Sequence, residues 1–209
     1  QIKTAIRYHN DILGINPLGI WLPECAYYEN LDKILSECGL RYAVLDAHGI
    51  LNAKPRPRYG VYAPICSRNG IAFFGRDGDS TLPVWSSKDG FPGHPMYREF
   101  HKDLGWELPN SKLNEKNIST SRPLGLKFHR ITKQNISLGE KEFYLESAAH
   151  KKAEEHAEKY LMQRAHQLKK LNSTYKFQPT LIAPFDAELF GHWWYEGPIF
   201  LKNIFKNCS

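Results

Sequence analysis

A strand–helix–strand pattern near the N-terminus limits this chain to few folds. Residues 19–24 form a short apolar run, residues 31–38 predict a helix that ends at Gly39, and residues 40–45 form a second apolar run. Two strands joined by a helix pair in parallel, because the helix returns the chain to the edge from which it started. We therefore expect an α/β protein with a parallel sheet.

A long irregular excursion is predicted from about residue 48 to residue 123. Prolines, glycines and aromatic residues alternate there, which disfavours regular helices, yet the aromatic content is too high for a disordered segment. An ordered excursion of this length is usually functional. Inside it, Asn69-Gly70 predicts a hairpin between residues 60–65 and 70–74. The remaining patterns predict strands at 125–131 and 179–185, a helix at 143–171 with an alanine stripe, and a helix that starts at 199.

Composition narrows the class of protein. The chain has 209 residues, 42% of them hydrophobic, which suits one domain or most of one. It lacks a run of about 18 apolar residues, so no membrane association is predicted. The net charge of +6 is spread among acidic residues, as in residues 151–159, and this favours a solvated helix face over a nucleic-acid surface.

The termini and the cysteines carry two further expectations. The chain begins with Gln1 and without a signal peptide, which suggests a trimmed or partial chain. The four cysteines show no C-x-x-C spacing, so neither a zinc site nor a disulfide framework is predicted. We expect reduced thiols in a cytoplasmic protein.

Acidic residues stand beside tryptophans in two segments that lie far apart in the sequence. Glu24 follows Trp21, and the acids Asp186 and Glu188 precede Trp193. Sugar rings have flat C–H faces and hydroxyl rims, which suit indole faces and carboxylates respectively. A catalytic pair of carboxylates that acts on a sugar is therefore conceivable.

Each of these residues also has an ordinary structural interpretation. Taken alone, Glu24 is most often a surface or capping residue, and Trp193 or Trp194 could pack in the core. Asp186 and Glu188 alternate, so on an extended backbone both would point to one face, where ion pairing is the alternative to catalysis. His192 could bind a metal, bind a hydroxyl group or lie in the core. Metal binding is the least favoured of these three interpretations. The histidines His48, His94, His129 and His192 lack the sequence spacing that metal ligands have.

Both segments resemble the third and fourth signature regions of glycoside hydrolase family 57, and the closest likeness is to its 1,4-α-glucan branching enzymes. Further blocks resemble that group in the same order, at residues 46–49, 74–77, 84–86, 97–100 and 125–132. The resemblance implies an incomplete (β/α)₇ barrel with the irregular insertion at about 48–123. Residues 1–209 would be the central part of this barrel, with the N-terminal barrel strands and the C-terminal helical domain absent.

The resemblance also implies the roles of the two acids. Glu24 corresponds to the catalytic nucleophile and Asp186 to the general acid/base. A retaining enzyme needs these carboxyl groups about 5 to 5.5 Å apart, one ionised for attack and one protonated for the leaving oxygen.

Seven residues are implied as substrate-binding: Trp21, His48, Arg98, Trp106, Gly125, His192 and Trp193. A structural role is the alternative for Arg98, Trp106 and Gly125. The family's branching enzymes use a loop aromatic to place the acceptor, and here four residues are candidates: Tyr59, Tyr62, Phe73 and Phe74. His94 stands where the family leads us to expect an acid or an amide.

The implied activity is that of a retaining α-glucan transferase, which cleaves α-1,4 linkages and forms α-1,6 branches through a glycosyl ester in storage-glucan synthesis. Its partner would be an α-glucan, with no cofactor, no metal, no nucleic acid and no membrane. An α-amylase or a 4-α-glucanotransferase of the same family is the first alternative. A catalytically silent glucan-binding protein is the second.

Overall fold

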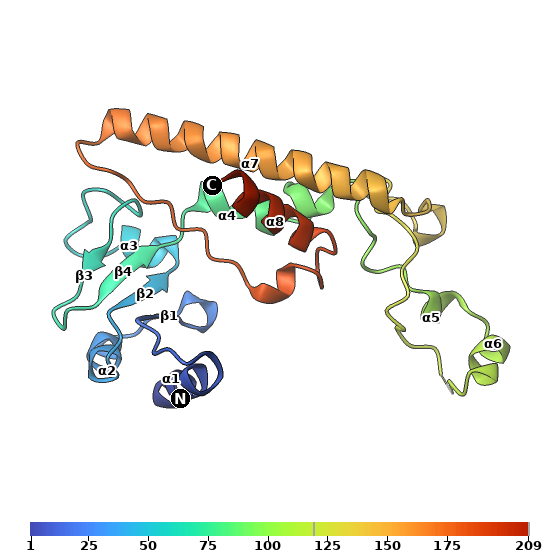
Figure 1. Cartoon of the computed structure of the whole chain (residues 1–209), viewed down its shortest axis with the longest axis horizontal. Helices are drawn as coiled ribbons and strands as arrows, with labels where there is room; N and C mark the ends of the chain where they lie inside the picture. The colour runs from blue at the N-terminus through green and yellow to red at the C-terminus, as the bar shows by residue number, and fades with distance from the viewer. Residues whose placement is uncertain (119, 209) are drawn as a thin grey trace. The chain divides into compact units, whose positions relative to one another are not determined.

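A computed structural model of the chain describes residues 1–118 and 120–208 (Figure 1). These residues divide into two compact units. The first comprises Gln1–Thr81 and Gln167–Pro184, and the second comprises Leu82–His166 and Phe185–Ser209. Each unit has a hydrophobic core of its own. None of the helices in the described ranges combines the length and the apolar character that crossing a bilayer requires.

The first unit is built on a small mixed sheet in the order β1-β2-β4-β3. Its strands are β1 (Gly19–Trp21), β2 (Tyr42–Leu45), β3 (Ile65–Cys66) and β4 (Ala72–Gly75). The strands β1, β2 and β4 are parallel, and β3 is antiparallel to β4. The helix α2 (Leu31–Glu37) joins β1 to β2, so the predicted strand–helix–strand unit is confirmed. The described residues show this sheet and no closed barrel.

The Tyr42 ring lies over Gly19 of β1. Gly19 pairs with Tyr42, and a Cβ on Gly19 would lie 2.1 Å from the Tyr42 ring. A larger residue at position 19 would therefore require the exposed Tyr42 side chain to move.

Helices cover this sheet and bury its apolar side chains (Figure 1). The helix α2 contributes Leu31 and Leu35, and α3 (Ala47–Leu51) contributes Ile50. They pack with a set of buried sheet and loop residues: Leu22, Leu40, Ala43, Leu45, Ile71 and Phe73. The helix α1 (Ile2–Leu13), which no sequence pattern predicted, packs on this core through the half-buried Ile2 and Ile6.

The prediction that residues 48–123 are too broken for helices is wrong in part. The segment contains α3, α4 (Gly78–Trp85), α5 (Leu104–Glu107) and α6 (Asn110–Glu115), together with the single 3₁₀ turn η2 (Phe91–Gly93). The helix α4 contains Pro83, and its first turn is capped by Asp77, whose carboxylate accepts hydrogen bonds from the backbone N–H of Ser80 (3.0 Å) and the side chain of Gln167 (2.9 Å). The predicted hairpin is confirmed as β3 and β4, but its first strand begins at Ile65.

Two other predicted strands are wrong. Residues 125–131 make only isolated bridges, Arg98 with Arg130 and His129 with Phe143, because Gly125 has a φ of 74° and interrupts the extended backbone. Residues 179–185 contain no strand. Pro179 and Pro184 lack the N–H that a ladder needs.

In the second unit, the part of the long helix α7 (Glu146–Thr174) up to His166 packs against α8 (Gly197–Asn207), and the two helices lie side by side in Figure 1. The predicted alanine stripe is confirmed, since Ala149, Ala153 and Ala157 are fully buried. Against it pack the large buried side chains Tyr97, Trp194 and Phe200. The short helices α5 and α6 belong to an excursion of this unit, which also contains the 3₁₀ turn η3 (Leu138–Glu140).

Candidate active site

Polar side chains gather at the carboxyl edge of the first unit's sheet. Because β1, β2 and β4 are parallel, the residues that follow them meet at one edge. Glu24 follows β1, Asp46 follows β2 and Arg76 follows β4. In α/β proteins this edge is where ligands and substrates bind.

Glu24 occupies a strained turn at the end of β1. It lies in the 3₁₀ turn η1 (Pro23–Cys25) with φ 55° and ψ 20°, and Cys25 has a φ of 52°. Residues other than glycine avoid this left-handed region, at a cost of roughly 1 to 3 kcal/mol each. Backbone hydrogen bonds hold the turn, from Cys25 N to Leu22 O (2.9 Å) and from Ala26 N to Pro23 O (3.0 Å). The result is an exposed Glu24 carboxylate on a rigid backbone.

A chain of contacts links the three strand ends around this turn. The Trp21 Nε1 donates to the Cys25 Sγ at 2.8 Å, and the Arg76 Nη2 approaches the same sulfur at 3.4 Å. The Arg76 guanidinium lies 5.6 Å from the Trp21 ring centroid. Its Nη1 lies 3.7 Å from Asp46 Oδ2. Cys25 and Arg76 thus hold the Trp21 indole in the turn that contains Glu24.

His48 is positioned by Asp46. The His48 Nδ1 lies 3.0 Å from Asp46 Oδ1, and the His48 backbone N–H donates to the same oxygen. Burial raises the pKa of Asp46, but the hydrogen bonds from His48 and the charge of Arg76 outweigh it and hold that pKa below its usual value. An ionised Asp46 fixes the His48 ring, which is exposed and can reach a hydroxyl group.

Sequence reasoning had not selected Asp46, Arg76 or Cys25 as site residues. A usable signal existed for two of them, since Asp46 and Arg76 are charged residues that directly follow apolar strands. No comparable signal marked Cys25, because its role depends on the turn.

Asp186 and Glu188 do not alternate on an extended backbone, so the prediction that they share one face is wrong. Residues Ala187–Leu189 form the 3₁₀ turn η4, and Asp186 immediately precedes it. Both acids are exposed. Glu24 belongs to the first unit and Asp186 to the second, so the approach of their carboxyl groups stays a prediction.

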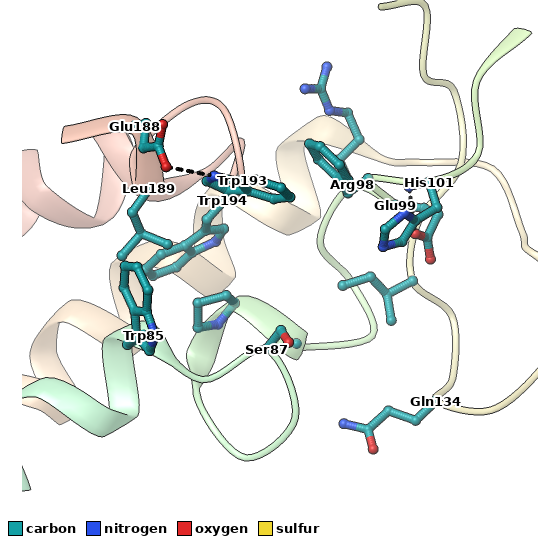
Figure 2. Close-up of a pocket in the computed structure, with 14 residues that line it drawn as sticks. Trp85, Ser87, Arg98, Glu99, His101, Gln134, Glu188, Leu189, Trp193 and Trp194 are labelled. Carbon is teal, nitrogen blue, oxygen red and sulfur yellow. Dashed lines mark hydrogen bonds between the residues drawn. The ribbon is translucent and has the colours of Figure 1, made fainter. Parts of the chain in front are cut away.

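A pocket of about 560 Å³ opens in the second unit, a size typical of small-molecule sites. Figure 2 shows the indole side chains together on one side of it, with Glu188 beside Trp193, and most of the polar side chains on the other side. Its aromatic residues are Trp85, Phe100, Trp193 and Trp194, and its polar residues are Ser87, Arg98, Glu99, His101, Gln134 and Glu188. This combination suits a ring with apolar faces and a hydroxyl rim.

Trp193 and Trp194 have different roles in this pocket. Trp194 is 1% exposed and belongs to the core, whereas Trp193 is 50% exposed. The Trp193 ring stacks on Phe100, with centroids 4.6 Å apart and an interplanar angle of 29°. His192 stands edge-on to both rings, at 5.4 Å from Phe100 and 5.0 Å from Trp193. His192 therefore supports the wall that Trp193 forms.

Both the side chain and the backbone of Arg98 contact neighbouring residues. Its guanidinium lies 3.6 Å from the Tyr195 ring centroid, and its backbone N–H donates to the buried Glu196 Oε1 at 3.0 Å. Burial raises the pKa of Glu196, although the nearby Tyr144 hydroxyl and the hydrogen bond from the Arg98 N–H oppose this shift. These contacts place Arg98 at the pocket.

Trp106 and Gly125 do not line the pocket. Trp106 lies on α5 and is 56% exposed. The Gly125 N–H donates to the buried Asp103 carboxylate at 2.9 Å, as do the N–H groups of Leu124 (2.8 Å) and Gly105 (2.9 Å) to its other oxygen. The Gly125 N–H therefore stabilises the excursion, which agrees with the structural alternative for this residue.

Comparison with known proteins assigns the chain to a family. The profile described as glycosyl hydrolase family 57 matches residues 1–209. The chain belongs to this family. It is 30% identical to the 1,4-α-glucan branching enzyme of Thermococcus kodakarensis over 99% of its own length and 32% of that enzyme. A probable 1,4-α-glucan branching enzyme of Mycobacterium tuberculosis is also 30% identical, over 93% of this chain and 32% of that protein.

Solved family 57 structures share the fold. The α-amylase AmyC of Thermotoga maritima superposes with a TM-score of 0.90 at 38% identity, over 99% of this chain and 40% of that one. The branching enzyme of Pyrococcus horikoshii superposes with a TM-score of 0.78 at 30% identity, over 97% of this chain and 38% of that one. The chain thus spans about a third of the curated relatives and two fifths of the solved chains.

The four aromatic candidates for the family's acceptor loop separate into two pairs. Phe73 and Phe74 lie in β4, where Phe73 is buried in the core, so they do not belong to a loop. Tyr59 and Tyr62 precede β3 and pack against Tyr175. Of the four, only Tyr59 and Tyr62 remain as loop candidates.

The residue at His94, unexpected for the family, has a packing role. Its Nδ1 accepts the Met96 N–H at 3.3 Å, and its ring stands edge-on to Tyr97 (5.6 Å) and His156 (5.1 Å). The Tyr97 hydroxyl in turn lies 2.8 Å from the His156 Nδ1. His94 is therefore part of an aromatic cluster next to α7.

This cluster predicts acid sensitivity of the second unit. Burial and the neighbouring His94 and Lys152 lower the pKa of His156 to about 4, against an ordinary value of about 6.5. The unfolded chain binds the proton at higher pH than the folded chain, so this contribution to stability is present above about pH 6.5 and is lost as the pH falls towards 4. The melting temperature should fall by roughly several degrees as the pH is lowered from about 6.5 to about 4.

The measurement compares wild type with His156→Gln between about pH 7 and pH 4.5. Glutamine keeps an acceptor for the Tyr97 hydroxyl but cannot be protonated, so its melting temperature should fall less steeply. His166→Gln, at an exposed position of the same helix, is the matched control and should follow wild type. Equal slopes for all three proteins would contradict the prediction.

No group of three or more His, Cys, Asp and Glu side chains within residues 1–118 and 120–208 is arranged to hold a metal ion. Metal independence stays a prediction, to be checked by assaying the enzyme after exhaustive chelation.

Proposed function

We propose that the protein carrying this chain is a retaining α-glucan transferase that forms α-1,6 branches. The observation that carries the proposal is Glu24, a carboxylate on a strained turn at the carboxyl end of a parallel strand, where Trp21 and Arg76 both contact the adjacent Cys25. Membership of family 57 and the similarity to branching enzymes of Thermococcus kodakarensis and Pyrococcus horikoshii support it.

The chemistry assigns one role to each acid. The Glu24 carboxylate attacks the anomeric carbon while Asp186 donates a proton to the leaving glycosidic oxygen, which breaks the α-1,4 bond and leaves a β-linked glycosyl ester on Glu24. Asp186, now ionised, takes the proton of an incoming sugar 6-hydroxyl, whose oxygen displaces Glu24 and forms the α-1,6 bond. Water in place of the hydroxyl gives hydrolysis.

The surrounding residues supply binding under this proposal. Trp21 and His48 contact the glucan near Glu24, the first by stacking and the second by a hydrogen bond to a hydroxyl group. The pocket of the second unit binds glucosyl units through Trp193, with Arg98 as a donor to hydroxyl groups. A solved family 57 branching enzyme of Thermococcus kodakarensis in complex with glucose, 30% identical over 97% of this chain and 39% of that one with a TM-score of 0.76, supports a glucan as the ligand.

The proposal extends to the fold. The parallel strands β1, β2 and β4 would be part of an incomplete (β/α)₇ barrel, since their carboxyl ends carry the polar residues as barrel strands do. A structure of the full-length protein tests this point directly.

An α-amylase is the second candidate. The observation that favours it is the similarity to AmyC of Thermotoga maritima, at 38% identity and a TM-score of 0.90. The two functions share the glycosyl ester and differ in whether water or a sugar hydroxyl resolves it.

The deciding experiment incubates the full-length protein with amylose and follows two products. Proton NMR of the anomeric region measures new α-1,6 linkages, and a reducing-end assay measures hydrolysis. Branching predicts α-1,6 signals with little gain in reducing ends, and an amylase predicts the reverse. Redistributed chain lengths alone indicate a 4-α-glucanotransferase, and binding of amylose without any product indicates a silent protein. A Glu24→Gln preparation controls for contaminating activity.

A further inference from the structure

We propose that Glu188 is a positioning residue that fixes the Trp193 indole as a platform for a glucosyl ring. The inference rests on the proposed glucan-binding function of the same pocket. It assigns Glu188 a role separate from the proton transfer of its neighbour Asp186.

Glu188 and Trp193 are joined twice. The Trp193 Nε1–H donates to the Glu188 Oε1 at 3.2 Å, as Figure 2 shows, and the Trp193 backbone N–H donates to the Glu188 carbonyl at 3.3 Å. The intervening turn is closed by hydrogen bonds from Trp194 N to Leu189 O and from Gly191 N to Trp194 O, both 2.8 Å. Gly191, with a φ of 101°, permits this turn. The acid and the indole are thus held as one element.

Two contacts restrict the indole in different ways. Stacking on Phe100 defines the plane of the ring, and the bond to Glu188 restricts rotation within that plane. Trp193 still has 50% of its surface exposed and lines the pocket, so it can accept the apolar face of a sugar. An indole ordered before the ligand arrives avoids the entropic cost of ordering it on binding.

This role has a different signature from catalysis. A carboxyl group that transfers protons fails when it is replaced by an amide, whereas a hydrogen-bond acceptor for an indole N–H survives the change, because glutamine retains an acceptor oxygen. Glu188→Gln and Glu188→Ala therefore separate the two roles.

The first experiment measures kcat and KM on amylose, and Kd for a linear maltooligosaccharide, in the full-length protein. Glu188→Ala should raise KM and Kd roughly two- to tenfold with kcat within about twofold of wild type, and Glu188→Gln should restore most of the loss. Trp193→Phe removes the N–H donor, so adding Glu188→Ala to it should weaken binding by less than about twofold further. Glu158→Ala on α7, also exposed, is the matched control.

The second experiment needs no glucan. In protein labelled with ¹⁵N-tryptophan, the Trp193 indole N–H signal is assigned by its loss in Trp193→Phe. The chemical shift of that signal should change in Glu188→Ala. In Glu188→Gln and Glu158→Ala it should stay close to the wild-type value. An unmoved signal in Glu188→Ala overturns the proposal whether or not the protein acts on glucans.

The remaining outcomes separate the two proposals. A collapse of kcat in Glu188→Gln, an unchanged KM in Glu188→Ala or fully additive effects in the double variant overturns the positioning role. A wild-type protein that neither binds nor converts α-glucan overturns the proposed function, and the indole signal then decides the Glu188–Trp193 coupling by itself.

Discussion

Replacing Glu24 with glutamine in the full-length protein is expected to lower kcat on amylose by at least about three orders of magnitude. An amide cannot attack the anomeric carbon as a carboxylate does, so no glycosyl ester forms. The amide has nearly the same shape, and the turn that holds Glu24 is stabilised by backbone hydrogen bonds that the change leaves in place. Glucan binding should therefore stay within a few-fold of wild type.

The measurement is steady-state kinetics with amylose, together with a binding isotherm for a maltooligosaccharide. Glu29→Gln, five positions along the chain and also exposed, is the matched control and should keep its activity. Turnover of Glu24→Gln within tenfold of wild type would remove Glu24 from the nucleophile role.

A chemical rescue separates the nucleophile from other roles of Glu24. In Glu24→Ala, added azide can take the place of the missing carboxylate and attack the anomeric carbon. The expected product is a glycosyl azide with inverted anomeric configuration, identified by NMR. Rescue with retained configuration would assign Glu24 to proton transfer instead.

Replacing Asp186 with asparagine is expected to lower kcat on amylose by about two to four orders of magnitude, the usual contribution of general acid–base catalysis. The loss should shrink for an aryl maltooligosaccharide, because an aryloxide leaves without a proton. In that case the glycosyl ester on Glu24 forms and then persists, since no base activates the acceptor. Mass spectrometry of the trapped protein measures this ester.

Azide again gives a decisive readout for Asp186. It needs no base, so it should accelerate turnover of the aryl substrate and yield a glycosyl azide with retained configuration. Asp89→Asn, an exposed carboxylate in the same unit, is the matched control and should behave as wild type. An Asp186→Asn enzyme that loses amylose and aryl substrates equally and ignores azide would contradict the acid/base role.

The elements predicted correctly from the sequence are those with a strong local pattern. The strand–helix–strand unit around α2 combines two apolar runs with a helix stopped by Gly39, and the stripe of α7 repeats at helical spacing. Such patterns record which side of an element is buried. The strand expected at 125–131 has apolar residues at alternate positions and the one expected at 179–185 is mostly apolar, but a strand exists only with a partner, and Gly125, Pro179 and Pro184 interrupt the pairing.

The sequence alone determined the chemical types at the site. Carboxylates beside tryptophans indicated a site for a sugar, and the resemblance to family 57 implied Glu24 and Asp186 as the catalytic pair. The match over residues 1–209 confirms the family. The acid/base and nucleophile roles remain predictions until the variants above are measured.

Only the tertiary structure decided which residues hold these groups in place. The contacts of Arg76 with Asp46 and Cys25 join the ends of three strands, and no spacing in the sequence encodes them. Sequence spacing also does not encode the stacking of Phe100 on Trp193, because these residues lie far apart in the chain. Nor did it predict the turn that contains Glu188, where an extended segment was expected. Sequence patterns report burial and local conformation, whereas the orientation of a side chain is set by the neighbours that the fold brings to it.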